Sequence, residues 1–310
     1  MDRVETVSHE HTCAILAKDV RKSYGAKSVL TGLDLSVVPG DICAVLGRNG
    51  AGKTTLLKIL LGLAPANSGE IRVYGETPGR ANSRIAYLCE NIALYPHLSA
   101  RDNLRVAALA GGLPDPAKND IGETLERVDL AAAGAKPARS FSLGMKRRLQ
   151  LAMALLIKPA DLMILDEPTN GLDVDGLLWL KQLLRDLRRE GLSVLVASHA
   201  MAEMQDIVTS YAILSDGVIK ARETWSPDSR IVHCHIGVAS GDVTRALAAL
   251  SAETEGAHLT AQRGVELETT LPQARVHEIL HRADVVPEYV TPVVLTLEDV
   301  FLSVTGEAAR

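Results

Sequence analysis

The sequence predicts an α/β protein with an antiparallel β subdomain, a helical subdomain and a small C-terminal α+β domain. Three observations lead to this prediction. Apolar runs at 42–46, 162–167 and 193–199 lack polar alternation, which is typical of parallel strands buried on both faces. A glycine-rich loop joins the first run to a helical pattern. Beyond residue 220 the pattern changes to short strands and helices, as expected of a second unit.

The glycine-rich loop, Gly-Arg-Asn-Gly-Ala-Gly-Lys-Thr at 47–54, matches the phosphate-loop pattern G-x-x-x-x-G-K-[ST] in its strand–loop–helix context. Glycines let backbone N–H groups wrap a phosphate chain, and the helix that follows adds its positive dipole end. Lys53 offers a charge to the phosphates, and Thr54 offers a hydroxyl to Mg²⁺. We expect a nucleotide site at Gly47, Asn49, Gly50, Ala51, Gly52, Lys53, Thr54 and Thr55.

The remaining elements of the first domain, expected at 14–222, follow in order. Residues 1–13 read as a loose polar tail, in which His9, His11 and Cys13 are too weak a pattern to predict a metal site. Short strands between residues 14 and 38, and at 71–75, suit an antiparallel sheet beside the phosphate-loop strand. Helical spacing then dominates residues 96–159, with expected helices at 102–110, 121–130 and 145–157.

Polar residues stand where two of the buried strands end. Asp166 and Glu167 end one strand, and His199 ends the next. Ligands in parallel sheets bind at the carboxyl ends of strands, so these side chains should face the phosphate loop. Asp166 suits Mg²⁺ binding, Glu167 suits orienting or deprotonating a water molecule, and His199 suits contact with the γ-phosphate.

A second helix start lies at 139–148. Ser142 and Gly144 would expose N–H groups and a hydroxyl at a dipolar helix N-terminus, which makes a second anion site. An ordinary capped helix with a basic first turn explains the same residues equally well. The residues alone leave both interpretations open.

Together these motifs resemble those of the ATP-binding-cassette (ABC) ATPases, over about residues 14–222. The resemblance rests on several motifs that occur in the family's order and spacing. Besides the phosphate loop they are Tyr24 at the adenine-stacking position, Glu90 at the glutamine-loop position, the signature loop 141–145 (Phe-Ser-Leu-Gly-Met), Asp166-Glu167, the crossing loop 170–173 (Asn-Gly-Leu-Asp) and the switch histidine His199.

The resemblance implies an ATPase that uses ATP and Mg²⁺. Such proteins pair head to tail, so Ser142, Gly144 and Asp173 would complete the site of a second copy. The resemblance also implies a separate transmembrane permease as partner, and hence a location on the cytoplasmic face of the cell membrane. The chain would meet the membrane only through that permease.

Two positions depart from the usual family pattern. Leu143 replaces the first signature glycine, and Glu90 replaces the glutamine, where a carboxylate could bind Mg²⁺ directly. Both departures, and Asn170, resemble the branch that exports peptide antibiotics of the lantibiotic and bacitracin type. The closing segment 297–306 resembles the tail of drug-export ATPases. We expect Glu90→Gln to keep ATPase activity but to alter its coupling to transport.

Other readings remain. The ATPase of nitrous-oxide-reductase copper maturation also has a Glu-Asn pair at the glutamine loop, as in Cys89-Glu90-Asn91. Soluble ABC proteins of DNA repair or translation resemble this chain less, because it lacks their coiled-coil insertion or second ATPase half. A regulatory module without turnover is disfavoured by Glu167 and His199.

Composition narrows the function classes. The net charge of −5 argues against a nucleic-acid partner. Apolar runs fall far short of the roughly 20 residues that span a bilayer, and the N-terminus has no apolar signal core. The cysteines form no C-x-x-C pair, which indicates reduced thiols. These features favour a cytoplasmic protein.

The C-terminal domain, expected at 228–310, has the strand and helix order of a split βαβ unit. Residues 277–281 (His-Glu-Ile-Leu-His) match the zinc-protease pattern H-E-x-x-H. We interpret the match as a surface helix, because no G-x-x-H continuation follows it. The run His233-Cys234-His235 is treated likewise, since its alternate residues supply only two ligands.

Overall fold

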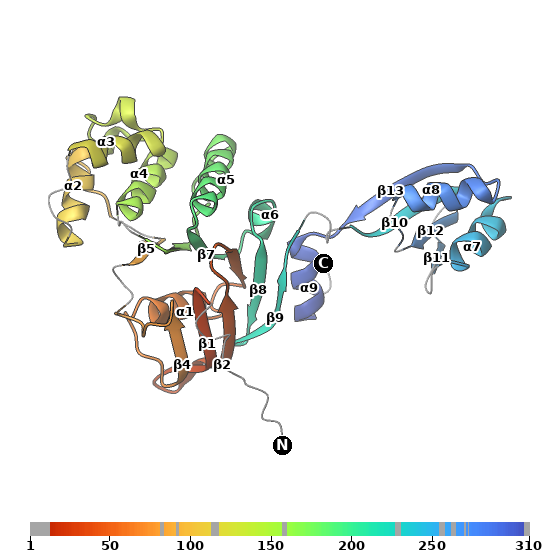
Figure 1. The fold of residues 1–310 in the computed structure, drawn as a ribbon, viewed down its shortest axis with the longest axis horizontal. Coiled ribbons are helices and arrows are strands. Elements are labelled where there is room, and N and C mark those ends of the chain that lie inside the picture. Colours follow the sequence, from red (N-terminus) through yellow and green to blue (C-terminus); the bar gives the residue numbers. More distant parts are fainter. Residues whose placement is uncertain are drawn as a thin grey trace, which may run out of the picture. The chain divides into compact units, whose positions relative to one another are not determined.

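The computed structural model of the chain describes residues 13–80, 84–90, 93–112, 118–156, 160–226, 231–253, 258–261, 265–269, 271 and 273–306. The chain divides into one unit of residues 1–224 with 301–310 and a second unit of residues 225–300 (Figure 1). The expected tail 1–13 therefore lies outside the described residues, except for Cys13.

A six-stranded sheet forms the centre of the first unit. Its strand order is β5 (Ile85–Leu88), β6 (Leu162–Asp166), β7 (Ser193–Ser198), β3 (Ile42–Leu46), β8 (Ser210–Ser215) and β9 (Val218–Thr224). Neighbours from β5 to β8 are parallel, and β9 runs antiparallel to β8. Every residue of β3, β6 and β7 is buried, which explains their unbroken apolar sequences.

An antiparallel sheet packs beside the central one, as predicted. Its order is β2 (Lys27–Val37), β1 (Ile15–Tyr24) and β4 (Ser68–Val73). Helix α1 (Lys53–Leu60) contacts both sheets, and all three share one apolar core. Strand β2 is continuous across Gly32, whose φ of +125° is readily adopted by glycine.

The helical subdomain is confirmed as a separate group of helices on the first unit (Figure 1). It contains α2 (Ala100–Ala110), α3 (Lys118–Arg127) and α4 (Leu143–Leu155), with short 3₁₀ turns at Ala131–Ala133 and Ala138–Ser140. Helix α5 (Val174–Arg189) precedes β7, and the short α6 (Met201–Met204) follows it. No helix in the described ranges is both long and apolar enough to span a membrane.

The second unit is a four-stranded antiparallel sheet with two helices. The strand order is β11 (His258–Ala261), β12 (Val265–Thr269), β10 (Ile231–Val238) and β13 (Pro287–Val294). Helices α7 (Val243–Ser251) and α8 (Gln273–Arg282) supply apolar residues to its core. Strands β10 and β11 are joined through α7, and β12 lies between them in the sheet. The connectivity is therefore the split βαβ expected from the sequence.

The end of the chain departs from the expected 228–310 domain. Helix α9 (Leu297–Thr305) begins in the second unit, but residues 301–310 group with the first. The reason is packing: Phe301 is only 5% exposed and lines a pocket of the first unit. The tail segment therefore belongs partly to the first unit.

The H-E-x-x-H match lies on α8. Its Glu278 forms ion pairs with Arg275 and Arg282, and these contacts hold the pKa of the Glu278 carboxyl below its usual range. The described side chains include no group of three or more His, Cys, Asp or Glu residues placed to hold a metal ion. Glu278 thus has the contacts of a surface ion-pair network.

Candidate functional site

Parallel pairing brings the ends of three strands together. Leu46, the last residue of β3, pairs with Ser198 of β7, and Ala197 pairs with Asp166 of β6. The phosphate loop, the two carboxylates and the histidine follow these strand ends directly. The register therefore places them at one edge of the sheet, as expected for a ligand site in a parallel sheet.

The phosphate loop depends on two of its glycines. Gly52 has φ +113°, and a Cβ there would lie 2.9 Å from Leu30 Cδ2. A Cβ on Gly47 would lie 2.6 Å from the Leu214 carbonyl oxygen. Both positions accept only glycine without a shift of neighbouring atoms. Glycine at these two positions lets the loop backbone pack closely against Leu30 and Leu214, and Gly52 directly precedes α1.

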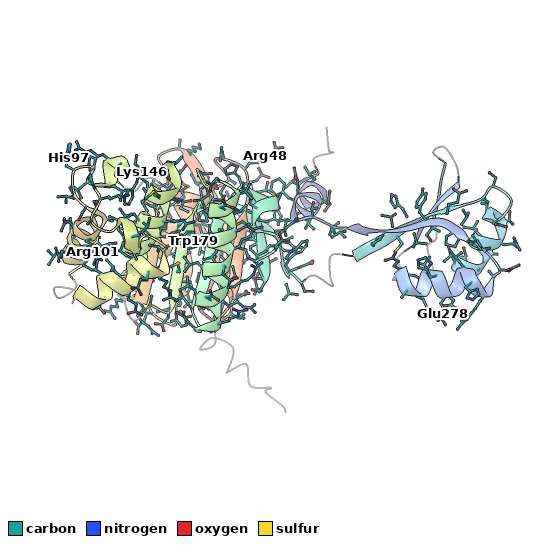
Figure 2. The ribbon with its side chains drawn as sticks, turned by 90° about the horizontal axis from the view of Figure 1, so that it is seen from above. Arg48, His97, Arg101, Lys146, Trp179 and Glu278 are labelled. Atoms are coloured by element: carbon teal, nitrogen blue, oxygen red, sulfur yellow. The ribbon has the colours of Figure 1, made fainter. Side chains whose placement is uncertain are left out.

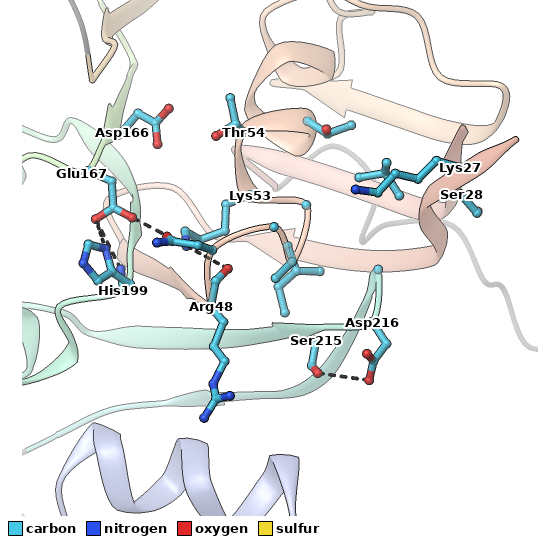
Figure 3. A pocket seen from close by; sticks show the side chains of 18 of the residues that line it. Lys27, Ser28, Arg48, Lys53, Thr54, Asp166, Glu167, His199, Ser215 and Asp216 are labelled. Atoms are coloured by element: carbon cyan, nitrogen blue, oxygen red, sulfur yellow. Dashed lines mark hydrogen bonds and ion pairs between the residues drawn. The ribbon is translucent and has the colours of Figure 1, made fainter. Parts of the chain in front are cut away.

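Lys53 is the first residue of α1 and is 7% exposed. Its Nζ donates hydrogen bonds to the carbonyl oxygens of Gly47 at 2.6 Å and Arg48 at 3.4 Å. The same Nζ lies 3.6 Å from Glu167 Oε1 (Figure 3). The loop thus holds its cation between the backbone and the carboxylate.

Glu167 has an unusual backbone and a well-held carboxylate. Its φ of +48° lies in the left-handed region, which is strained for a residue with a Cβ. Oε2 lies 2.9 Å from His199 Nδ1 (Figure 3). It also accepts hydrogen bonds from the Ser198 hydroxyl at 3.2 Å and the His199 N–H at 3.3 Å. A strained residue with a fixed side chain is typical of catalytic sites.

Asp166 lies beside this carboxylate and is 4% exposed. Burial, followed by the negative charges of Glu167 and Glu90, raises the pKa of Asp166 to about 6. The buried carboxylates of Asp166 and Glu167, with the exposed Glu90 close by, therefore concentrate negative charge at this edge of the sheet. A divalent cation would relieve this repulsion, and hydroxyl and carboxylate oxygens are the donors that Mg²⁺ prefers.

A cavity of about 750 Å³ joins these groups. Most predicted residues line it, namely Tyr24, Asn49, Gly50, Ala51, Gly52, Lys53, Thr54, Thr55, Glu90, Asp166, Glu167 and His199. Gly47 contributes through its carbonyl bond to Lys53. Tyr24 is 47% exposed, as an aromatic platform for a base requires.

Sequence reasoning missed part of the lining. These residues come from β2, from the end of β8 and the turn after it, and from α9: Lys27, Ser28, Val29, Leu214, Ser215, Asp216, Gly217, Phe301 and Thr305. In Figure 3 the Arg48 side chain extends toward the C-terminal helix. No local motif marks these positions, because they reach the pocket only through the packing of distant elements.

Besides Gly47, three predicted residues do not line this cavity, and they lie at the starts of two helices. Ser142 caps α4, where its hydroxyl accepts a hydrogen bond from Met145 N–H at 3.2 Å. Gly144 lies in the first turn of the same helix, and Asp173 caps α5 through Gly176 N–H. These residues take no part in the pocket of their own chain.

Leu143 and Glu90, the two residues that depart from the usual family pattern, lie in different surroundings: only Glu90 lines the cavity. Leu143 is 64% exposed and packs against Gly171, where an added Cβ would lie 2.6 Å from Leu143 Cδ2. Glu90 lines the cavity, and its Oε1 lies 3.5 Å from Asn170 Nδ2. Glu90 is therefore within the carboxylate group, whereas Leu143 contacts the crossing loop.

Residues 30–170 match the family described as "ABC transporter". The bacitracin transport ATP-binding protein BcrA of Bacillus licheniformis is 40% identical over 208 residues, covering 66% of this chain and 67% of that protein. The lantibiotic transport ATP-binding protein SrtF of Streptococcus pyogenes is 36% identical, with 65% and 87% covered. The daunorubicin resistance ATP-binding protein DrrA3 of Streptomyces coeruleorubidus is 37% identical, with 68% of each covered.

Solved structures give the same likeness. An ATP-binding subunit of an ABC transporter aligns with a TM-score of 0.61 and 29% identity, covering 68% of this chain and 90% of that one. CbiO1 of Clostridium perfringens, part of the ABC transporter complex cbiONQ, aligns with a TM-score of 0.63 and 23% identity, covering 69% and 89%. The second likeness is one of fold alone.

Proposed function

This chain belongs to the ATP-binding proteins of ABC transporters, and on that premise we propose that it drives an exporter as one of two identical ATPase subunits. ATPase activity coupled to transport is the activity of the family. The proposal adds the roles of individual residues, the second copy, the permease and the class of cargo.

One observation supports hydrolysis above the others. The buried carboxylate of Glu167 is held by Ser198 and His199 at the edge of the pocket that contains the phosphate loop. A binding module has no need of a strained, oriented carboxylate at this place. A water molecule between Glu167 and a bound γ-phosphate would lose its proton to Glu167 as its oxygen attacks phosphorus. The bond from that phosphorus to the bridging oxygen would break, and ADP would leave.

The other residues bind and orient the nucleotide. Lys53 and the backbone N–H groups of the loop hold the phosphates, and Tyr24 offers its ring to the base. Thr54 and Asp166 would hold Mg²⁺, which supplies charge neutralisation of the phosphate chain when bound. Glu90 adds a further carboxylate to this group. His199, through its bond to Glu167, would orient the attacking water and contact the γ-phosphate.

The second copy explains the residues outside the cavity. Ser142 and Gly144 stand at the N-terminus of α4, where backbone N–H groups and the helix dipole favour an anion. In a head-to-tail pair they would meet the nucleotide on the phosphate loop of the partner. Asp173, at the start of α5, would cross the same interface.

The cargo follows from the relatives. Their names refer to bacitracin, lantibiotics and daunorubicin, which favours export of a peptide antibiotic, drug or similar amphiphile. A separate permease would supply the membrane path and hold this chain on the cytoplasmic face of the membrane. None of the contacts described above favours the copper-maturation alternative.

The test is Glu167→Gln, which keeps the shape of the side chain but removes its basicity. We expect turnover to fall by about 100-fold or more, as for the loss of a catalytic base. Binding of Mg-ATP should remain, so the variant should accumulate as a dimer on ATP in size-exclusion chromatography with light scattering.

Glu190→Gln is the matched control, because Glu190 pairs with Arg127 away from the pocket. It should keep normal turnover and stay monomeric after ATP is consumed. Normal hydrolysis by Glu167→Gln would contradict the role of Glu167. Hydrolysis lost without an ATP-dependent dimer would contradict the role of the second copy.

A further inference from the structure

Arg147 lies in the second turn of α4, close behind the signature loop. It is 4% exposed and does not line the nucleotide cavity. Buried arginines are rare unless their N–H groups are all satisfied, because the desolvation of an unpaired guanidinium is costly. The partners of this side chain therefore indicate why it is there.

One edge of the guanidinium binds the end of β6. Nη2 donates to the carbonyl oxygens of Glu167 at 2.6 Å and Asp166 at 3.2 Å, and Nε donates to that of Pro168 at 3.3 Å. These are three consecutive carbonyls of the segment that contains the catalytic carboxylate. Arg147 therefore holds the backbone of this segment and leaves the carboxylates free of it.

The other edge binds the glutamine-loop position. Nη1 donates to the Glu90 carbonyl at 3.2 Å and to Gln150 Oε1 at 3.2 Å, with the Cys89 carbonyl at 3.5 Å. A single planar group thus joins α4, the end of β6 and the segment after β5. Such a fork of five N–H donors is specific to arginine, since lysine has a point charge on a flexible stem.

The backbone at Glu167 needs such a restraint. Its φ of +48° is unfavourable for a residue with a Cβ and persists only where neighbouring groups fix it. The Glu167 carbonyl accepts from Arg147 and, more weakly, from Asn170 N–H at 3.3 Å, and its N–H donates to the Ala197 carbonyl at 2.9 Å. Arg147 makes the shortest of these bonds.

Charge favours the same arrangement. Burial lowers the pKa of the Arg147 guanidinium, whereas the nearby Cys89 and the carboxylates of Glu90, Asp166 and Glu167 raise it. Arginine remains charged in proteins under either influence. The fixed positive charge behind the strand end offsets part of the repulsion among the three carboxylates.

We infer that Arg147 is a positioning residue for hydrolysis, which fixes the left-handed backbone of Glu167 and joins it to the signature helix and the Glu90 segment. The inference rests on the catalytic role proposed for Glu167. Because α4 begins with Ser142, the same side chain links the half-site that a chain offers to its partner with the catalytic residues of its own pocket.

The test is Arg147→Gln in the full chain. We expect kcat to fall by about 10- to 100-fold, as for a catalytic group displaced by an ångström, while the Kd for Mg-nucleotide changes by less than about threefold. Arg147→Lys should recover little of the loss, because one ammonium group cannot reach both backbone segments. Full recovery by lysine would contradict the inference.

Arg148→Gln is the matched control. Arg148 stacks on Trp179 of α5, which is labelled in Figure 2, and pairs with Asp129. The variant therefore removes a neighbouring guanidinium from the same helix without touching the β6 end. It should keep kcat within about twofold of the unmodified protein. An equal loss in both variants would indicate a general effect on α4 and would overturn the inference.

A double-mutant cycle separates positioning from folding. If Arg147 acts through Glu167, adding Arg147→Gln to Glu167→Gln should lower the residual turnover by less than about twofold. If Arg147→Gln lowers turnover by the same factor with and without Glu167→Gln, the role of Arg147 is overturned and that of Glu167 is not. Normal turnover by Glu167→Gln would instead overturn the role of Glu167, so the two failures are distinguishable.

Discussion

Two helices of the first unit begin with residues suited to anion binding, but they differ in how they begin. Helix α1 starts after Gly52, which has left-handed backbone geometry and no capping side chain. Helix α4 starts after Ser142, whose hydroxyl already accepts Met145 N–H, and presents the exposed Leu143 beside it. The first start lies inside the cavity and the second lies outside it.

In the proposed head-to-tail pair, this difference would divide one nucleotide site between two chains. At α1 the phosphate loop, the buried Lys53 and the carboxylates line one cavity within one chain, which favours the proposed binding of a nucleotide by that chain alone. At α4 the surface is open, and nothing lies within 4 Å of a Cβ added to Gly144. The two starts should therefore respond differently to substitution, α1 in binding and α4 in turnover.

Loss of the cation at α1 should give the largest effect. Lys53→Ala removes a charge-assisted bond to phosphate, and we expect the affinity for Mg-ATP to fall by about 100-fold. Isothermal titration or a fluorescent nucleotide would measure it. Retained affinity would mean that the loop backbone alone binds the phosphates. It would contradict the assignment of nucleotide binding to Lys53 at the α1 start.

A change at α4 should affect turnover only. Gly144→Glu places a negative charge at the helix N-terminus, and we expect kcat to fall by about 10- to 100-fold with unchanged nucleotide Kd, as when an anion-binding donor is lost. Gly122→Glu in α3 is the control, because it introduces the same side chain at another open helical position. Weakened nucleotide binding by Gly144→Glu alone would contradict the division.

Substitution in α9, which lines one side of the cavity, should have a smaller effect on nucleotide affinity. Phe301→Ala removes an aromatic ring from the cavity lining, and we expect a Kd increase of about fivefold, the typical worth of an aromatic contact. Leu302→Ala changes a half-buried neighbour that does not line the cavity and should leave Kd unchanged. Equal Kd values for both variants would mean that Phe301 of α9 does not contribute to nucleotide binding.

The smallest expected effect concerns stability. The pKa of Asp166 is raised to about 6 in the folded protein, so the folded state binds more protons than the unfolded state between about pH 4 and 6. Stability is therefore lost as pH rises through this window, and the full loss persists above it. Without Mg²⁺ or nucleotide, Asp166→Asn should raise Tm at pH 7.5 by about 2–6 °C.

The pH dependence is the check on this prediction. Calorimetry at pH 4.5 and 7.5 should show the stabilisation by Asp166→Asn at the higher pH, and most of it should be gone at the lower one. A gain of equal size at both values would mean that burial of a polar group, and not its charge, causes the effect.

Much of this site follows from sequence, for identifiable reasons. Residues 42–54 contain a buried strand, a loop that needs glycine and a helix start, and each is a local property of the chain. Asp166 and His199 could be placed because parallel strands share one edge. Phe301 and the β8–β9 turn could not, since their place depends on packing between elements far apart in the chain.

The sequence by itself determined the α/β fold, the order of its elements and the residues that we propose to hold phosphate, because glycine geometry, apolar periodicity and strand-end polarity act over short distances. Only the tertiary structure decided that Arg147 binds both the β6 end and the Glu90 carbonyl, and that Glu167 has a left-handed backbone. A hydrogen bond between residues 20 or 57 positions apart leaves no local pattern. It exists only once both segments have packed against the same helix.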